Sequence, residues 1–242
     1  MIEMVSFTDF EKAIKEDQNI VVVKIDSNKI LCRPKGGCKS KQIIKIPKFV
    51  DPNISFISGF LIGDGHLAKD GFRIIVDIVS IDLLKILSKK FEEVFGIDVK
   101  IKRKVDKRPN MQLRWKIDFR SKPIWLLFNL VFGIPSGKKS EHVTIPSVVL
   151  EDEKCRKMFF SGLFLADGGR KGKRISFTTI SEKLFVDVQH LLQQFEIRFF
   201  TKRWTHTRHG RKVFDIVICR KDDINKFISI FPLVETKFAG VA

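Results

Sequence analysis

Two apolar helices with the same pattern are predicted in different parts of the chain. They read ISGFLIGDGH at residues 57–66 and FSGLFLADGG at residues 160–169, and each ends in one aspartate, Asp64 or Asp167, between small residues. A single Asp-Gly step usually marks only the turn that ends a helix. Because this step recurs at the end of two equivalent apolar helices, the pattern indicates a shared role for the two carboxylates.

Small residues recur at helical spacing within each of these helices. Gly59 is followed by Gly63, and Gly162 by Ala166, so that one face of each helix has almost no side-chain bulk. Faces of this kind allow two helices to pack backbone against backbone. We therefore expect the two helices to pack together and to bring their terminal carboxylates close to each other.

The rest of the two segments also repeats. Lys102-Arg103 recurs as Lys202-Arg203, and Arg120 recurs as Arg220. Apolar alternation and helical periodicity predict helix, strand, helix, strand, strand and helix in each copy. The expected elements of the first copy are 55–63, 72–79, 81–95, 99–105, 111–119 and 123–132. Those of the second copy are 154–166, 174–179, 181–195, 197–206, 212–220 and 222–231.

These patterns divide the chain into four predicted segments. Residues 1–45 form an N-terminal extension that contains a strand pair and has no assigned role. Residues 46–135 form the first repeat, 136–147 a linker and 148–242 the second repeat. The expected fold class is α+β.

The charge of the chain favours a nucleic-acid partner. Its 242 residues contain 45 Lys and Arg against 28 Asp and Glu, a formal net charge of +17. A balanced, heavily charged surface would carry as many acidic as basic residues, and this chain does not. A binding surface for phosphate groups is the expected consequence.

The hydrophobic content, the N-terminal sequence and the cysteine spacing argue against several classes of protein. Hydrophobic residues make up 44% of the chain, but no apolar run reaches the ~20 residues of a membrane span. The acidic start MIEMVSFTDFEKAIKED is unlike a signal peptide, so we expect an intracellular protein, cytoplasmic or nucleoid-associated, with no membrane partner. The four cysteines show no zinc-ligand spacing and are expected to be reduced thiols.

Two carboxylates at adjacent helix C-termini point to a metal site. The end of a helix already carries partial negative charge, so two aspartates there are costly unless cations lie beside them. Oxygen ligands favour Mg²⁺ over zinc, with Mn²⁺ as a substitute. Ions of this kind can activate water and stabilise the leaving oxygen of a phosphodiester.

With these features together, the chain resembles the single-chain, two-repeat form of the LAGLIDADG homing endonucleases. The signature aligns with residues 57–65 and 160–168, and the resemblance spans roughly residues 46–236. The signature's earlier acidic position is replaced by Ile62 and Leu165. Since the family's metal chemistry depends on the last Asp, we expect that chemistry to be retained.

The resemblance implies a fold and an activity. The fold would be two αββαββα-like repeats about a pseudo-twofold axis, each with a curved antiparallel sheet, which together form a DNA-binding saddle. The activity would be site-specific, metal-dependent hydrolysis of both DNA strands at a long asymmetric target. The protein would act as a monomer and take part in the mobility of an intron or intein. The metal would be held by Asp64 and Asp167, with the carbonyls of Gly63 and Ala166 as further ligands.

The strands of the repeat carry basic side chains on one face. In residues 111–119, polar and apolar side chains alternate, which predicts a strand with one buried face and one face that can read DNA bases and neutralise phosphates. The candidate DNA contacts are Arg73, Lys100, Lys102, Lys104, Lys107, Arg108, Gln112, Arg114, Lys116, Arg170, Lys171, Lys173, Arg174, Lys202, Arg203, Arg208, Arg211 and Lys212.

The family resemblance also implies a basic residue near each metal that polarises the attacking water. Arg120 and Arg220 are repeat-equivalent candidates at strand ends, with Lys122 and Lys221 close by. His66 follows the first motif and has no counterpart in the second. It is expected to be a DNA or surface contact.

Alternatives remain at this point. One is a protein of the same fold that binds nucleic acid without cutting, either a maturase acting on intron RNA or a transcription regulator. The other is an intein, but the chain begins with Met1 and contains no His-Asn pair, so it is not an intact one.

Overall fold

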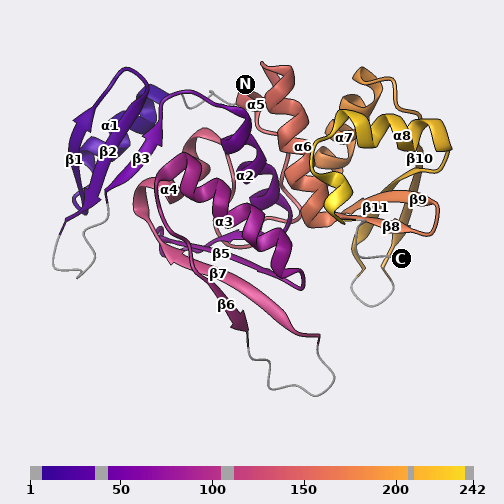
Figure 1. Ribbon diagram of the computed structural model, residues 1–242, viewed down its shortest axis with the longest axis horizontal. Coiled ribbons are helices and arrows are strands. Elements are labelled where there is room, and N and C mark those ends of the chain that lie inside the picture. The colour runs from indigo at the N-terminus through magenta and orange to yellow at the C-terminus, as the bar shows by residue number, and fades with distance from the viewer. Residues whose placement is uncertain (1–6, 36–42, 105–111, 207–209, 238–242) are drawn as a thin grey trace.

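The computed structural model describes residues 7–35, 43–104, 112–206 and 210–237. Three antiparallel sheets lie along the long axis of the molecule, and the helices lie mainly on one side of the two repeat sheets (Figure 1). The two helices that carry the repeated motif, α2 (Pro52–Gly63) and α6 (Glu153–Asp167), stand side by side at the centre.

The N-terminal residues form a small module of their own. Helix α1 (Phe7–Glu16) packs on a sheet of β1 (Ile20–Ile25), β2 (Lys29–Pro34) and β3 (Ile44–Pro47) in the order β1-β2-β3. The expected strand pair is thus present, with β3 added to it. Buried side chains of the helix and of two strands form its core: Phe10, Ile14, Ile30, Cys32, Ile44 and Ile46.

The first repeat follows the order helix, two strands, helix, two strands, helix. After α2 come β4 (Gly65–Leu67), β5 (Arg73–Ile78), α3 (Ile81–Phe95), β6 (Ile101–Lys104), β7 (Arg114–Arg120), α4 (Lys122–Leu126) and a π-helical turn η1 (Leu127–Val131). The strands form a sheet in the order β4-β5-β7-β6.

The second repeat has the same order and the same sheet. A short helix α5 (Ser147–Leu150) precedes it. After α6 come β8 (Gly168–Lys171), β9 (Arg174–Thr179), α7 (Glu182–Gln194), β10 (Phe200–Thr205), β11 (Lys212–Ile218), α8 (Lys221–Ile230) and a 3₁₀ turn η2 (Val234–Lys237). Its sheet order, read from the strand that follows the motif helix, is β8-β9-β11-β10, which corresponds strand for strand to the order of the first sheet. The αββαββα order implied by the resemblance is therefore confirmed.

Local sequence explains where the helices begin and end. Ser80 caps α3 by accepting a hydrogen bond from the Leu83 amide, and Gly96 ends the helix at a φ of 67°, which glycine adopts without strain. Ser181 caps α7 in the same way. Asp51 and Asp152 accept amide hydrogen bonds at the starts of α2 and α6. The two repeats thus use matching polar residues at matching helix starts.

Some elements differ from the sequence prediction. Strands β4 and β8, directly after the motif helices, were not expected from the pattern, since each has only three or four residues and includes glycine. The helix expected at 123–132 divides into α4 and the π-helical turn. The boundary expected at residue 46 falls inside β3, which pairs with β2 of the N-terminal module.

Candidate metal centre and nucleic-acid interface

The interface between α2 and α6 depends on two glycines. A Cβ placed on Gly59 would overlap the carbonyl oxygen of Phe159, and one placed on Gly162 would overlap that of Phe56. These obstacles are main-chain atoms, which cannot rotate away as the end of a side chain could. The two helices therefore approach backbone to backbone, as the small-residue spacing predicted.

Large apolar side chains flank this interface and hold each helix in its own repeat. Phe60, Leu61, Leu163 and Phe164 are fully buried, and Phe164 contacts the Phe227 ring of α8, with ring centroids 5.0 Å apart. This packing fixes how far each helix extends, and therefore where its last residue lies.

The helix tips meet at the predicted aspartates. A Cβ placed on Gly63 would lie 3.3 Å from the carboxyl carbon of Asp167, so the end of α2 touches the acidic end of α6. A cavity of about 230 Å³ opens beside this contact, lined by residues that include Gly63, Lys139, Asp167 and Thr178. The structure thus brings the two halves of the predicted site together.

Burial shapes the titration of both carboxylates. Desolvation raises the pKa of Asp64 above its ordinary value, although the charges of Lys237 and Lys139 act in the opposite direction. Desolvation and the nearby charge of Asp64 raise the pKa of Asp167 to about 6. Ionising both carboxylates in one partly desolvated site is unfavourable, because the two negative charges repel each other. Nearby cations therefore stabilise the charged form.

Two lysines supply positive charge at the tips. The Lys139 ammonium donates hydrogen bonds to the last carbonyls of α2: Leu61, Ile62 at 2.6 Å and Gly63 at 2.9 Å. The Lys237 ammonium does the same for α6, with Phe164 at 3.2 Å, Leu165 at 2.7 Å and Ala166 at 3.0 Å. Each lysine therefore satisfies carbonyls that a helix end leaves without partners.

The electrostatic coupling of these lysines crosses the interface. Lys139 caps α2 but interacts most strongly with Asp167 of α6, whereas Lys237 caps α6 and interacts most strongly with Asp64 of α2. Burial lowers the pKa of each lysine to about 8, against the opposing effect of the carboxylates. Four charges, two of each sign, therefore form a pseudo-symmetric cluster.

Sequence reasoning missed both lysines. Lys139 lies in the segment that was assigned as a linker, and Lys237 lies beyond the last predicted helix. The signal that could have revealed them is an extension of the repeat: in each copy a proline, Pro135 or Pro232, follows the last helix and a lysine comes shortly after it.

The four basic residues expected near the metals have other contacts. Arg120, at the end of β7, is 3.7 Å from Asp70. Lys122 is 3.6 Å from Asp17 of the N-terminal module and lies over the Phe72 and Trp125 rings. Arg220 and Lys221 start α8. None of the hydrogen bonds found among the described residues joins these four to the tips of α2 or α6.

The first repeat's sheet has the polar face that was predicted. Cross-strand pairing places Lys102 beside Lys116, and Lys104 beside Arg114, on the face opposite the buried Val76 and Ile117. Two aspartates lie among these cations. Asp77 is 2.5 Å from Lys104 and 2.6 Å from Arg114.

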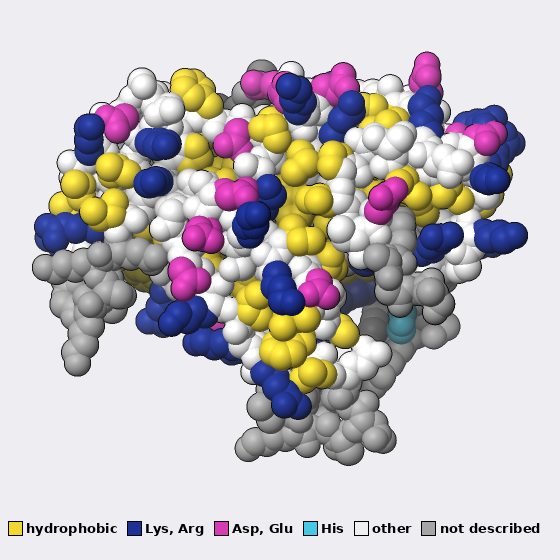
Figure 2. Space-filling model, in the orientation of Figure 1, with side chains coloured by type: hydrophobic (Ala, Val, Ile, Leu, Met, Phe, Trp, Pro, Cys, Tyr) yellow, Lys and Arg dark blue, Asp and Glu magenta, His cyan; other side chains and the backbone are white. Residues whose placement is uncertain are grey.

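The second aspartate of this face, Asp118, is 2.7 Å from Arg73 and 3.3 Å from Lys116. Hydrogen bonding to Arg73 holds the pKa of Asp118 below its usual range. The basic side chains of the first sheet are thus partly neutralised and held in fixed positions. Figure 2 shows Lys and Arg side chains gathered along the lower edge of the molecule, beneath the first repeat.

The corresponding face of the second sheet is less tightly paired. Lys202 pairs across the strands with Asp215, whose carboxylate accepts a hydrogen bond from Thr178 at 2.9 Å. Phe200 and Trp204 lie on this face as well and are largely exposed. Arg203 does not share it, because alternation puts Arg203 on the helix-covered side, over the Phe185 and Phe214 rings.

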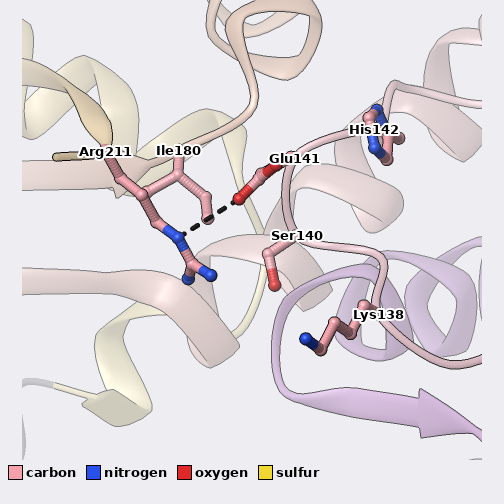
Figure 3. A pocket seen from close by; sticks show the side chains of 6 residues that line it. All are labelled: Lys138, Ser140, Glu141, His142, Ile180 and Arg211. Carbon is pink, nitrogen blue, oxygen red and sulfur yellow. Dashed lines mark ion pairs between the residues drawn. The ribbon is translucent and has the colours of Figure 1, made fainter. Parts of the chain in front are cut away.

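The remaining predicted contacts lie near the sheet ends. Arg170 and Arg174 belong to the β8–β9 hairpin, and Arg211 and Lys212 lie at the start of β11. Arg211 is 3.2 Å from Glu141 across a cavity of about 280 Å³ that Lys138, Ser140, His142 and Ile180 also line (Figure 3). Lys107, Arg108 and Arg208, and the side chain of Lys171, lie outside the described part of the chain.

The donors at the helix tips suit a hard divalent cation. Two carboxylates and the neighbouring carbonyls offer only oxygen, the ligand type that Mg²⁺ and Mn²⁺ prefer. Within the described residues, no group of three or more His, Cys, Asp or Glu side chains could hold a metal on its own. A cation bound here would therefore need oxygens from water or from a phosphate, for which the adjacent cavity leaves space.

In the described ranges, no helix is long and apolar enough to cross a membrane.

Of the cysteines, Cys32 and Cys155 are buried free thiols and Cys219 is an exposed one, while Cys38 lies outside the described residues. Burial raises the pKa of the Cys32 thiol to about 12.

Comparison with known proteins identifies relatives of part of the chain. Residues 154–232 match the family described as LAGLIDADG-like domain. Two curated proteins of Methanocaldococcus jannaschii are similar: a replication factor C small subunit, 26% identical over 70% of this chain, and a probable translation initiation factor IF-2, 25% identical over 91% of it. The chain spans only 9% and 19% of the lengths of these relatives.

Solved structures share the fold. The homing endonuclease I-DmoI, in complex with DNA and Mn, aligns with a TM-score of 0.52 and 21% identity over 74% of this chain and 96% of that one. Full-length DUF199/WhiA from Thermatoga maritima aligns with a TM-score of 0.53 and 15% identity over 76% of this chain and 57% of that one. At such identities the likeness establishes the fold. With the motif in both halves, the αββαββα order in each and the family match over residues 154–232, the resemblance to the LAGLIDADG proteins that the sequence indicated is confirmed.

Proposed function

We propose that this protein is a divalent-metal-dependent, site-specific endonuclease of the homing type that cuts both strands of duplex DNA. One aspartate from each repeat, Asp64 and Asp167, would hold the metal ions, with Mg²⁺ as the natural ion and Mn²⁺ as a substitute. The chain would act as a monomer on an asymmetric target, because its two sheets present different side chains.

The observation that carries this proposal is the contact between the helix tips. Asp167 lies against the end of α2 at Gly63, and both aspartates border the same charge cluster at the ends of the two central helices. The net charge of +17, the basic face of the first sheet and the basic side chains near the ends of the second sheet support duplex DNA as the substrate.

Different residues of the chain would have different roles in this reaction. Asp64 and Asp167 bind the ions, and the basic sheet faces orient the duplex so that one phosphodiester of each strand lies at the tips. Lys139 and Lys237 place positive charge beside these phosphates, the role that sequence reasoning gave to Arg120, Arg220, Lys122 and Lys221. A bound divalent ion supplies activation of water and stabilisation of the leaving oxygen.

A second candidate is a nucleic-acid-binding protein of the same fold that does not cut. One observation favours it: the ammonium groups of Lys139 and Lys237 already balance the two carboxylates and occupy the carbonyls of Gly63 and Ala166. The presence of two aspartates at helix ends is therefore compatible with a stable fold even without a metal. The same fold in DUF199/WhiA, which is not named as an endonuclease, fits this reading.

Cleavage selection separates the two candidates. The protein is incubated with a randomised duplex library in Mg²⁺, and in Mn²⁺ in parallel, and the new DNA ends are sequenced. An endonuclease yields ends that recur at one sequence on both strands, and yields none with the Asp64→Asn/Asp167→Asn double variant. Enrichment of bound duplexes without any new ends would contradict the proposal. Tighter binding to structured RNA than to duplex DNA would instead favour a maturase.

A further inference from the structure

The N-terminal module has no counterpart in either repeat, and its charge is unevenly distributed. Residues 7–26 contain five acidic and three basic side chains, whereas residues 27–50 contain seven basic and no acidic ones. Strands β2 and β3 both belong to this acid-free stretch. The second part of this small module therefore has a net positive charge and the first part a net negative one.

Strand alternation places this charge on one face of the module's sheet. Ile30 and Cys32 of β2 are buried against α1, so Lys29 and Arg33 lie on the opposite, outer face. Lys45 of β3 pairs with Leu31 and lies on that outer face too. Lys35 directly follows β2 and is exposed. In the part of the chain that the structure describes, none of these four basic residues is in an ion pair.

Two further lysines of the module differ from these four. Lys24 is 3.0 Å from Asp26, and Lys48 is 3.0 Å from Glu11, so both have acidic partners. Exposed cations that repel one another and have no acidic partner lower the stability of a fold slightly. Binding of a polyanionic partner would neutralise these cations and remove their repulsion, which favours the complex.

The module is fixed to the first repeat rather than loosely attached. Strand β3 packs against α3 and α4, and α1 packs against α4 and η1, within one continuous hydrophobic core. The carbon chain of Lys45 lies against Gly96 at the end of α3, and Asp17 is 3.6 Å from Lys122 of α4. A surface on this module therefore keeps its position relative to the repeat sheets.

That position extends the line of the two sheets. Figure 1 shows the module at one end of the long axis, beyond the first repeat and on the opposite side from the second. A duplex that followed both repeat sheets and extended beyond the first repeat would reach this end of the molecule. No acidic side chain in residues 27–50 would repel its phosphates.

We propose that the outer face of β2 and β3, with Lys29, Arg33 and Lys35, is a third DNA-binding surface that holds the phosphate backbone flanking the first repeat's half of the target. The inference rests on the proposed binding of duplex DNA and adds a contact outside the two repeats. Its side chains, lysine and arginine on a small sheet, suit phosphates rather than base edges, so the surface adds affinity and reach and reads no sequence.

The test compares variants with equal net charge. One carries Lys29→Gln, Arg33→Gln and Lys35→Gln. The control carries Lys85→Gln, Lys89→Gln and Lys183→Gln, exposed lysines on the helices that cover the sheets. Affinity for a random-sequence duplex that extends well beyond both repeat sheets is measured as a function of salt concentration for both variants and the wild type.

Counterion release predicts that the slope of log K against log salt becomes shallower by about 2 to 3 in the module variant and stays unchanged in the control. On a target recovered by cleavage selection, hydroxyl-radical protection should shrink at one end only. If the triple variant unfolds, Lys29→Gln and Lys35→Gln are tested singly, with an expected change in slope of about 1 each.

The outcomes separate this inference from the proposed function. A steep wild-type slope with no change in the module variant would overturn the third surface and leave DNA binding by the repeats intact. That result would assign the face, whose neighbours Val23 and Ile43 are about half exposed, to a protein partner. An equal loss in the control would overturn the inference too. A flat wild-type slope would overturn both it and the proposed function.

Discussion

The two repeats are closely alike at the tips of their central helices and clearly different on their sheet faces. At the tips, each repeat supplies an aspartate, a small residue before it and a lysine that caps the last carbonyls. On the first sheet, Asp77 and Asp118 each hold two cations in place. On the second, Asp215 bonds to a threonine, and Trp204 is exposed beside Lys202.

This contrast suits the proposed function. The two phosphodiesters of a duplex are chemically the same, so the groups that act on them should be the same. The base sequences of the two half-sites differ, so the side chains that read them should differ. Symmetry at the tips and asymmetry on the faces are what a single chain that cuts one asymmetric site requires.

The largest expected effect concerns the α2–α6 interface that holds the tips together. Gly162→Ala should destabilise the protein by about 3 kcal/mol, because the new Cβ meets the Phe56 carbonyl rather than a movable side chain. Gly59→Ala should act alike, since it meets the Phe159 carbonyl. Urea unfolding measures both.

Gly169 is the matched control for these variants. A Cβ at Gly169 has nothing within 4 Å, so Gly169→Ala should change the unfolding free energy by less than about 0.5 kcal/mol. Equal effects of the three substitutions on the unfolding free energy would contradict the close backbone contact. A loss of stability with only one of Gly59→Ala and Gly162→Ala would show that the two sides of the interface are not equivalent.

The next effect concerns the two lysines. Lys139→Met leaves the last carbonyls of α2 without their donor and should cost about 2 kcal/mol of stability and about a hundredfold in cleavage rate. Lys237→Met should have the same direction with a smaller loss of stability, because Lys237 is less deeply buried. Denaturation and single-turnover cleavage measure the two quantities.

Lys138 provides the control for the lysine pair, since it is exposed and adjacent in sequence. Lys138→Met should leave stability and cleavage rate near those of the wild type. A loss of cleavage with Lys138→Met as large as that with Lys139→Met would show that the capping contacts are not the cause.

The smallest effect concerns the sheet faces. Asp77→Asn frees Lys104 and Arg114 and should raise affinity for random-sequence duplex about threefold. Asp215→Asn should raise it less, because Asp215 bonds to Thr178 and no cation within ion-pair distance is found for it in the described residues. Fluorescence anisotropy at fixed salt compares them, and equal gains would remove the contrast between the faces.

The same aspartate predicts a pH dependence. Partial burial raises the pKa of Asp77, but the hydrogen bonds and charges of Lys104 and Arg114 outweigh this and hold it below its ordinary value. A depressed pKa stabilises the fold fully above the unfolded value of about 4, and this stabilisation is lost as pH falls through the folded value. Unfolding free energy should therefore drop less between pH 6 and about pH 3 in Asp77→Asn than in the wild type.

Much of this structure follows from local sequence. The motif helices, the cap residues Ser80 and Ser181 and the longer strands of both repeat sheets leave periodic or positional signals, whereas the short strands β4 and β8 do not. The glycine spacing correctly indicates the contact between α2 and α6. The role of Lys139 and Lys237 was harder to predict, because each caps a helix that lies far from it along the chain, and only the repeated proline before each lysine relates them. Arg203 was grouped with Lys202, although neighbouring residues on a strand face opposite sides.

Part of the positive charge expected beside the two aspartates comes from the chain itself. Two aspartates at helix ends do need cations, and two lysines already supply them. Binding of divalent ions at the same place distinguishes an enzyme from a binding protein, and variants of the two carboxylates test it directly.

The most direct measurement is therefore cleavage of a selected target in Mg²⁺ by Asp64→Asn and by Asp167→Asn, with Asp82→Asn on the exposed surface of α3 as the control. Metal binding by the two aspartates predicts that each of the first two loses double-strand cleavage by a factor of about 1,000 or more while DNA affinity stays within about threefold of the wild type, and that the control cuts normally. Full double-strand cleavage by either variant would contradict it.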